Sequence, residues 1–152
     1  LEVSDDGNLL AFGTDTTGFR EYYLSVKDLR TGEMVETKFV KAGQAEWAAD
    51  NKTLFYVTED AAKRAHKLWR HTLGEPKEKD PLVYEEKDEL FRLGVGRSRD
   101  GQYLFRTSRS ATTAEQWFLP ADRPAGTWTL IAKREDGHDY SADHRDGLFY
   151  IR

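Results

Sequence analysis

A short pattern recurs four times along this chain of 152 residues and constrains its fold more than any other feature. The copies lie at Val3–Phe12, Trp47–Tyr56, Arg97–Phe105 and Asp143–Tyr150, and each joins an acidic turn to a short apolar run. The aligned aspartates are 44, 50 and 46 positions apart: Asp6, Asp50, Asp100 and Asp146. A period of about 40–50 residues made of short strands and turns is typical of propeller blades. The repeat therefore predicts a scaffold rather than a catalytic centre.

The second half of each unit follows the same spacing. Leu24 and Leu29 match Leu68 and Leu73 at an offset of 44, and a further offset of 50 leads from Leu68 to Phe118. The connecting loops are expected to keep the same register: Thr14–Glu21, Thr58–Ala65 and Ser108–Glu115. Agreement at several separated points indicates a repeated structural unit.

Each unit is expected to contain four antiparallel strands, because its runs are short, aromatic and β-branched and are bounded by Gly, Asp and Asn. An inner strand precedes each acidic turn. The remaining strands are predicted at Leu9–Gly13, Tyr22–Leu29 and Val35–Val40, at Thr53–Thr58, Lys67–Leu73 and Pro81–Tyr84, and at Gln102–Thr107, Glu115–Leu119 and Thr127–Ala132. Glu59–His66 is compatible with a short helical turn or with a plain loop.

The predicted fold is all-β, with four-stranded antiparallel blades amounting to about three and a half blades of a larger propeller. The whole chain, 1–152, forms one partial propeller domain, with units near 1–42, 43–89, 90–135 and 136–152. Closed propellers typically have four to eight blades. We therefore expect either a fragment, truncated at Leu1, or a chain that forms homo-oligomers through its open blade edges.

The composition excludes several classes of function. The chain has no Cys, which excludes thiol chemistry and fits a reducing compartment, so a cytoplasmic location is expected. No run approaches the roughly 18 apolar residues of a membrane span, and no signal peptide is recognised, so no membrane partner is expected. The net charge is −4, and the densest basic stretch is short: Lys63, Arg64, Lys67 and Arg70. Nucleic-acid binding is therefore not expected.

Motifs that resemble catalytic or cofactor sites are better explained as structure. Gly96–Asp100 lacks the final Gly of a serine-hydrolase elbow, and Gly94–Gly96 lacks the third Gly of a dinucleotide fingerprint. His138, with Asp139, and His144, with Asp143, would lie about 20 Å apart on an extended strand, so convergent metal ligands are not expected. The sequence thus predicts no catalytic residue, no cofactor and no metal site.

Several stretches resemble a known family. Ser4–Phe12 and Leu24–Glu33 resemble the first blades of the prolyl oligopeptidase family. Trp47–Tyr56, Asp88–Ser98 and Asp143–Arg152 are similar to its oligopeptidase B branch. The sequence departs from the family where Ser4-Asp5-Asp6-Gly7 replaces the usual Ser-Pro-Asp-Gly, and at Tyr23, Ser25, Ala65 and His66.

The resemblance implies a seven-bladed propeller over an α/β-hydrolase domain that cleaves short peptides after Lys or Arg with a Ser-Asp-His triad. This chain would be the non-catalytic, substrate-gating segment, and the catalytic domain of the parent chain and its short basic peptides would be its partners. No triad residue can be assigned here, so the isolated chain should be inactive. The alternative function is that of a self-associating module for assembly or binding, in which open blades pair by strand addition.

One acidic run has both a structural and a functional interpretation. Glu85–Glu89 contains four carboxylates: Glu85, Glu86, Asp88 and Glu89. The structural interpretation is a solvated loop between blades. The functional one is that the four side chains guide basic peptides electrostatically toward an enzyme cavity, which the family's substrate preference motivates.

Overall fold

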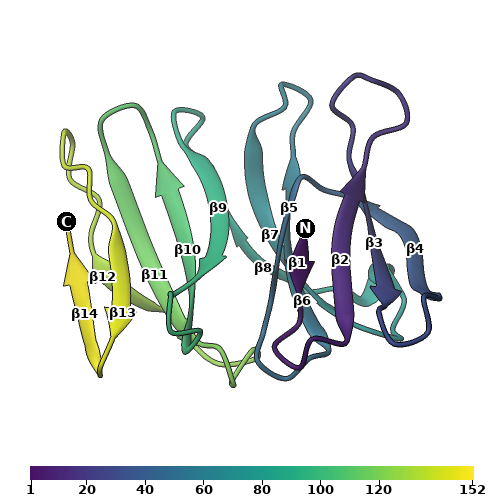
Figure 1. The fold of residues 1–152 in the computed structure, drawn as a ribbon. Helices are drawn as coiled ribbons and strands as arrows, with labels where there is room; N and C mark the ends of the chain where they lie inside the picture. Colours follow the sequence, from purple (N-terminus) through teal and green to yellow (C-terminus); the bar gives the residue numbers. More distant parts are fainter.

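The computed structural model describes residues 1–152 and contains fourteen strands and one short 3₁₀ turn (Figure 1). The first two sheets comprise β1 (Glu2–Val3), β2 (Leu9–Thr14), β3 (Tyr23–Asp28) and β4 (Met34–Lys41), then β5 (Gln44–Trp47), β6 (Thr53–Glu59), β7 (Ala65–Thr72) and β8 (Leu82–Glu85). The others comprise β9 (Arg92–Arg97), β10 (Tyr103–Arg109), β11 (Ala114–Pro120) and β12 (Thr129–Ala132), then β13 (Ala142–Arg145) and β14 (Leu148–Ile151).

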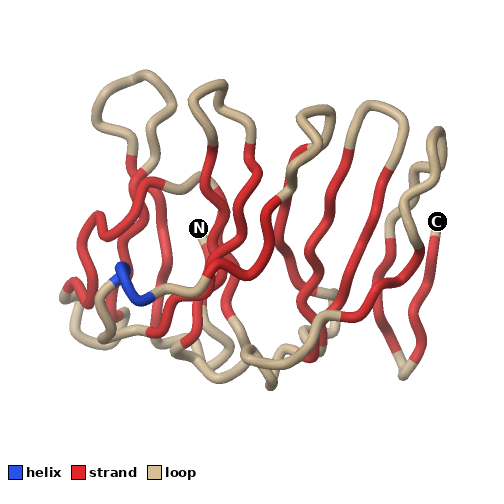
Figure 2. Tube along the Cα trace, turned by 180° about the vertical axis from the view of Figure 1, so that it is seen from behind, coloured by secondary structure: helices blue, strands red, loops and turns tan.

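The strands form three antiparallel meanders of four strands and one final two-stranded hairpin. The sheets follow one another in a row, from the purple first sheet to the yellow hairpin (Figure 1). The 3₁₀ turn at Lys77–Lys79 lies in the connection between β7 and β8 and is the blue segment of Figure 2. The predicted fold class, all-β with about three and a half four-stranded blades, is confirmed. No helix in the chain has the length and apolar character needed to cross a membrane.

The meander places two kinds of connection at opposite ends of the blades. The turn end contains the acidic turns, at 4–8, 48–52, 98–102 and 146–147. The loop end contains the β2–β3, β6–β7 and β10–β11 hairpin loops and the links between sheets, including 86–91 and 133–141; these lie at the top of Figure 1. The acidic run predicted as a candidate site therefore lies at the loop end.

The first and third acidic turns repeat in detail because the same polar groups close them. Ser4 Oγ donates to Asp6 Oδ1 at 2.7 Å and accepts the Leu9 N–H at 3.0 Å. The third blade repeats this arrangement at Ser98 and Asp100. The fourth turn is tighter, since Asp146 and Gly147 both have positive φ, at 52° and 79°, as a two-residue hairpin turn requires.

The largest apolar core lies between neighbouring sheets. Side chains from β6 and β7 interlock with side chains from β9, β10 and β11. This cluster consists of Ala48, Phe55, Val57, Leu68, Leu93, Leu104, Leu119 and Ala121. Two smaller clusters join the first and second sheets, and Trp47 and Leu54 are fully buried in one of them. Each sheet therefore depends on its neighbour to keep its apolar face from water.

The structure corrects the repeat in the third blade. In the first two blades Gly13 pairs with Leu24 and Val57 pairs with Leu68. In the third blade Thr107, which is equivalent to Gly13 and Val57, pairs with Gln116. Gln116, and not Phe118, is therefore the structural equivalent of Leu68, because the β10–β11 loop is two residues shorter than the β6–β7 loop. A slip of two residues keeps every side chain on the same face of a strand, which explains why the apolar pattern concealed it.

The segment Glu59–His66 contains no helical turn. Strand β6 continues to Glu59, and β7 begins at Ala65, earlier than predicted. The Asp60 carboxylate accepts the Ala62 and Arg64 N–H groups at 3.0 and 2.9 Å and so closes a hairpin loop.

Replacing Leu68 by Ala is expected to lower the free energy of unfolding by about 2–5 kcal/mol, because the side chain is fully buried between two blades. Urea unfolding followed by circular dichroism measures the change. Leu90→Ala is the matched control, since Leu90 is 78% exposed and its loss should change little. Equal effects of the two variants would contradict the assigned core.

Candidate functional site

The acidic run lies where two links between blades meet a hairpin loop at the loop end. Its four carboxylates differ in environment: Glu86 is buried, Glu85 is half-buried beside Lys67 on the ladder, and Asp88 and Glu89 are exposed. The run is therefore only partly the solvated loop that the sequence suggested.

Glu86 is held in place by an arginine from the next link. Its carboxylate accepts hydrogen bonds from the Arg134 guanidinium, and Glu86 Oε2 also accepts the Asp88 N–H at 3.1 Å. Burial alone would raise the pKa of Glu86, but the hydrogen bonds from Arg134, Ser108 and the Asp88 backbone outweigh it, and the pKa is lowered. Glu86 is thus an ionised, buried partner of Arg134.

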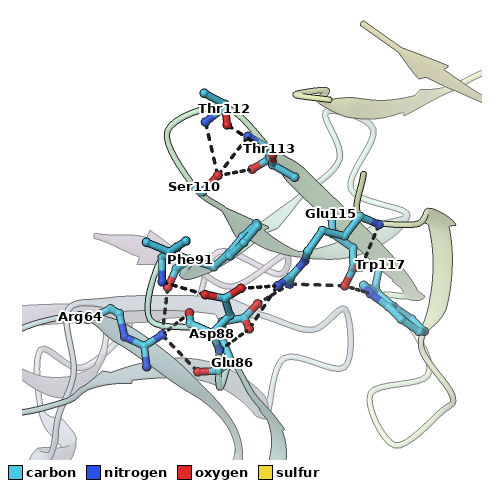
Figure 3. A network of polar contacts seen from close by, with 11 residues as sticks. Arg64, Glu86, Asp88, Phe91, Ser110, Thr112, Thr113, Glu115 and Trp117 are labelled. Carbon is cyan, nitrogen blue, oxygen red and sulfur yellow. Dashed lines mark hydrogen bonds and ion pairs between the residues drawn. The ribbon is translucent and has the colours of Figure 1, made fainter. Parts of the chain in front are cut away.

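Arg134 extends this contact across the interface between blades. Its guanidinium carbon lies 3.7 Å from the centre of the Phe91 ring, and its backbone N–H donates to Glu115 Oε2 at 3.1 Å. The nitrogen Nη2 also lies 3.7 Å from Glu115 Oε1. Figure 3 shows Glu86, Phe91 and Glu115 converging on this point. A single cation therefore joins the link after β8 to the third blade.

A second arginine fixes the backbone of the acidic run. Arg64 Nη1 lies 3.2, 3.0 and 3.0 Å from the carbonyl oxygens of Glu86, Asp88 and Phe91 (Figure 3). Arg64 Nε donates to Asp60 at 3.2 Å. Carbonyl oxygens that would otherwise need water are satisfied in this way, so the run is held in one shape with Asp88 and Glu89 facing outward.

The sequence did not identify Arg134 as the partner of Glu86. The two residues are 48 positions apart, which is about one blade period. The offset of 50 between the second and third units leads from Glu86 to Asp136, so the sequence repeat alone does not point to Arg134.

At the turn end, Arg97 joins three blades. Its two terminal nitrogens each donate to one carboxylate oxygen of Asp5, at 3.0 Å, and Nη1 also donates to the Trp47 carbonyl at 3.0 Å. Its Nε donates to its own blade at the Gly101 carbonyl, at 3.1 Å. Bidentate arginine–carboxylate pairs are among the stronger polar contacts. Within the motif Gly96–Asp100, Gly96 and Arg97 lie in β9, and Arg99 and Asp100 lie in the acidic turn that follows.

Glu46, on the inner strand β5, is the acid with the most displaced titration. Burial, followed by the negative charge of Glu2, raises its pKa from 4.5 to about 7, and the nearby Arg97 opposes this shift. Its Oε1 accepts only the neighbouring Trp47 N–H, at 3.2 Å. Glu46 thus changes charge near neutral pH without a cationic partner of its own.

The histidines near the C-terminal hairpin do not form a metal site. His144 Nδ1 lies 2.6 Å from Asp100 Oδ2 and ties the last hairpin to the third blade. His138 stacks near Tyr140, with ring centres 5.5 Å apart. No group of three or more His, Cys, Asp or Glu side chains is arranged to hold a metal ion.

Comparisons with known proteins agree with this architecture. The family model "Prolyl oligopeptidase, N-terminal beta-propeller domain" matches residues 1–152. The chain is 40% identical to dipeptidyl aminopeptidase BI of Pseudoxanthomonas mexicana, over 99% of this chain and 21% of that protein. It is 34% identical to protease 2 of Moraxella lacunata, over 93% of this chain and 21% of that protein.

A solved structure gives the same picture. Oligopeptidase B from Leishmania major superposes with a TM-score of 0.81 at 29% identity, over 95% of this chain and 21% of that chain. The chain therefore spans about a fifth of the length of the relatives that it matches.

Replacing Arg134 by Met is expected to lower the free energy of unfolding by about 3 kcal/mol, because Glu86 would stay buried without its counter-ion. Urea unfolding at pH 7 measures the loss. Arg145→Met is the matched control, since the Arg145–Asp146 pair is exposed and should contribute little. A loss no larger than that of the control would show that the buried pair does not hold the blades together.

Replacing Glu46 by Gln is expected to raise the stability at pH 8 and to change it little at pH 5. The folded state binds the Glu46 proton more tightly than the unfolded state, so wild-type stability falls as the pH rises from 4.5 to about 7. Gln has no proton to lose, so the stability of the variant should not show this decrease as the pH rises. Urea unfolding at the two pH values measures the difference, and a constant difference between variant and wild type would contradict the assignment.

Proposed function

The chain belongs to the prolyl oligopeptidase family, as its N-terminal β-propeller domain, and from this premise we propose that it gates substrate access in a serine peptidase that cleaves short peptides after Lys or Arg. The observation that carries the proposal is the match of the whole chain to this domain, together with relatives whose printed names are those of peptidases. In this proposal an α/β-hydrolase domain of the parent chain supplies the chemistry. The propeller supplies shape and charge, and we propose a cytoplasmic location.

The geometry supports an electrostatic role for part of the acidic run. Asp88 and Glu89 are exposed and Glu85 is half-buried, while Arg64 holds the backbone between them. Fixed surface carboxylates raise the local concentration of cationic peptides and speed their association. Glu86 does not belong to this set, because it is buried against Arg134, whereas Asp88 lies 4.0 Å from the same guanidinium and is exposed. The steering set is therefore Glu85, Asp88 and Glu89.

This role is tested in a full-length peptidase that carries the propeller segment. The triple variant Glu85→Gln, Asp88→Asn and Glu89→Gln should lower kcat/KM for Arg- and Lys-containing peptides at low salt by roughly threefold to tenfold. The difference from wild type should vanish at high salt, because salt screens the attraction. Stopped assays across a range of ionic strength measure both effects.

A control variant removes the same charge from the turn end: Glu33→Gln, Asp122→Asn and Asp146→Asn. These positions are exposed, and none lies on the acidic run. An equal loss in both triples would indicate a net-charge effect rather than steering. An unchanged salt dependence in the first triple would refute steering by these carboxylates.

A second candidate function, self-association, is favoured by the outer surface of the last hairpin. Leu148, Tyr150 and Ile151 are 60%, 51% and 56% exposed on β14, which has one strand neighbour only. Open strand edges with apolar side chains invite pairing with another chain. This alternative predicts a concentration-dependent solution mass above that of a single chain, whereas gating within a parent peptidase does not require it.

A further inference from the structure

A buried histidine at the first interface between blades faces a carboxylate with each of its ring nitrogens. His71, on β7, is 1% exposed. Its Nδ1 lies 2.8 Å from Asp80 Oδ1, and its Nε2 lies 2.6 Å from Glu36 Oε2. These distances are those of hydrogen bonds to charged groups.

The two carboxylates belong to different blades. Glu36 is on β4, the outer strand of the first blade, whereas Asp80 lies in the β7–β8 connection of the second. The same outer strand also places Phe39 against the imidazole, with ring centres 4.6 Å apart and planes at 23°. Gly74 donates its N–H to Glu36 Oε1 at 3.1 Å. The outer part of this interface therefore centres on His71.

The geometry around His71 determines how many protons its ring must carry. A neutral imidazole carries one N–H, so only one of the two carboxylates could accept a hydrogen bond from it. Each carboxylate already has another donor: Tyr56 O–H donates to Asp80 Oδ2 at 2.7 Å, and Gly74 N–H donates to Glu36. For the imidazole to donate a hydrogen bond to both carboxylates as well, each of its ring nitrogens must carry a proton.

The ionisable groups that face His71 come from three elements. They are Glu36 from β4, Asp80 from the β7–β8 connection, and Tyr56 from β6, which acts through Asp80. Burial, followed by Asp80, raises the pKa of Tyr56, so its hydroxyl remains a donor. No competing acceptor is therefore created as the pH passes through the neutral range.

We propose that His71 is a proton-dependent latch between the first two blades. Doubly protonated, it holds β4 against the second blade; after losing one proton, it presents a bare nitrogen to a carboxylate less than 3 Å away. That contact is repulsive, and the carboxylate loses the hydrogen bond that the ring had donated to it. The latch is therefore closed while both ring nitrogens carry a proton and loosens when the ring loses one, so a rise in pH opens it. The latch is independent of the proposed peptide specificity.

The protonation state is tested by NMR on the 152-residue chain labelled with ¹⁵N. The ring signals of His71 are identified by their loss in His71→Gln. We expect both ring nitrogens to be protonated at pH 6. A single protonated nitrogen at pH 6, with β4 still protected from exchange, would overturn the proposal.

The mechanical consequence is tested by hydrogen exchange of the β4 amides. Between pH 6 and pH 8.5, and after correction for base catalysis, their exchange should accelerate about tenfold relative to the amides of β10. Glu36→Gln should abolish this dependence, because the amide group of Gln can donate to the bare nitrogen. Glu33→Gln, in the exposed β3–β4 turn, should retain it. Equal pH dependence in wild type and Glu36→Gln would refute the latch.

Discussion

The structure depends on the packing of each sheet against the next. A single four-stranded blade has two faces, and in this chain the fully buried side chains lie where two blades meet: Phe55 and Leu68 of the second blade contact the third, and Trp47 and Leu54 contact the first. The second and third blades have a neighbour on each side, whereas the first blade and the last hairpin each have one. Stability in such an array comes from nearest-neighbour interfaces, so these two outer elements depend on a single interface each.

Polar ties reinforce the same interfaces at both ends of the blades. Arg97 joins the first three blades at the turn end, and Arg134 joins the second-blade link to the third blade at the loop end. Between the first two blades the tie is the histidine His71. The two arginines are charged, and all three side chains have polar partners in the neighbouring blades. They therefore specify how the blades dock, whereas the apolar clusters supply most of the driving force.

Much of the fold was predictable from the sequence, because the acidic turns and the alternation of apolar residues recur with the period of a blade. The match of Leu68 to Phe118 was wrong because a loop shorter by two residues leaves the facing of every side chain unchanged. The candidate site was only partly predictable. In the sequence, Glu86 could not be distinguished from an exposed acid, because its buried position depends on Arg134, which is 48 residues further along the chain. Likewise, His71 meets Glu36 and Asp80 only once two blades have docked.

Native-state hydrogen exchange across all strands, with the solution mass measured on the same sample, tests whether contacts between neighbouring blades hold the chain together. For a single chain in solution, we expect the slowest exchange in β6 and β10, which belong to the two blades with a neighbour on each side. We expect fast exchange in β14, whose apolar side chains are exposed. Protection of β14 equal to that of β6 in a sample of single chains would show that contacts between blades do not determine stability.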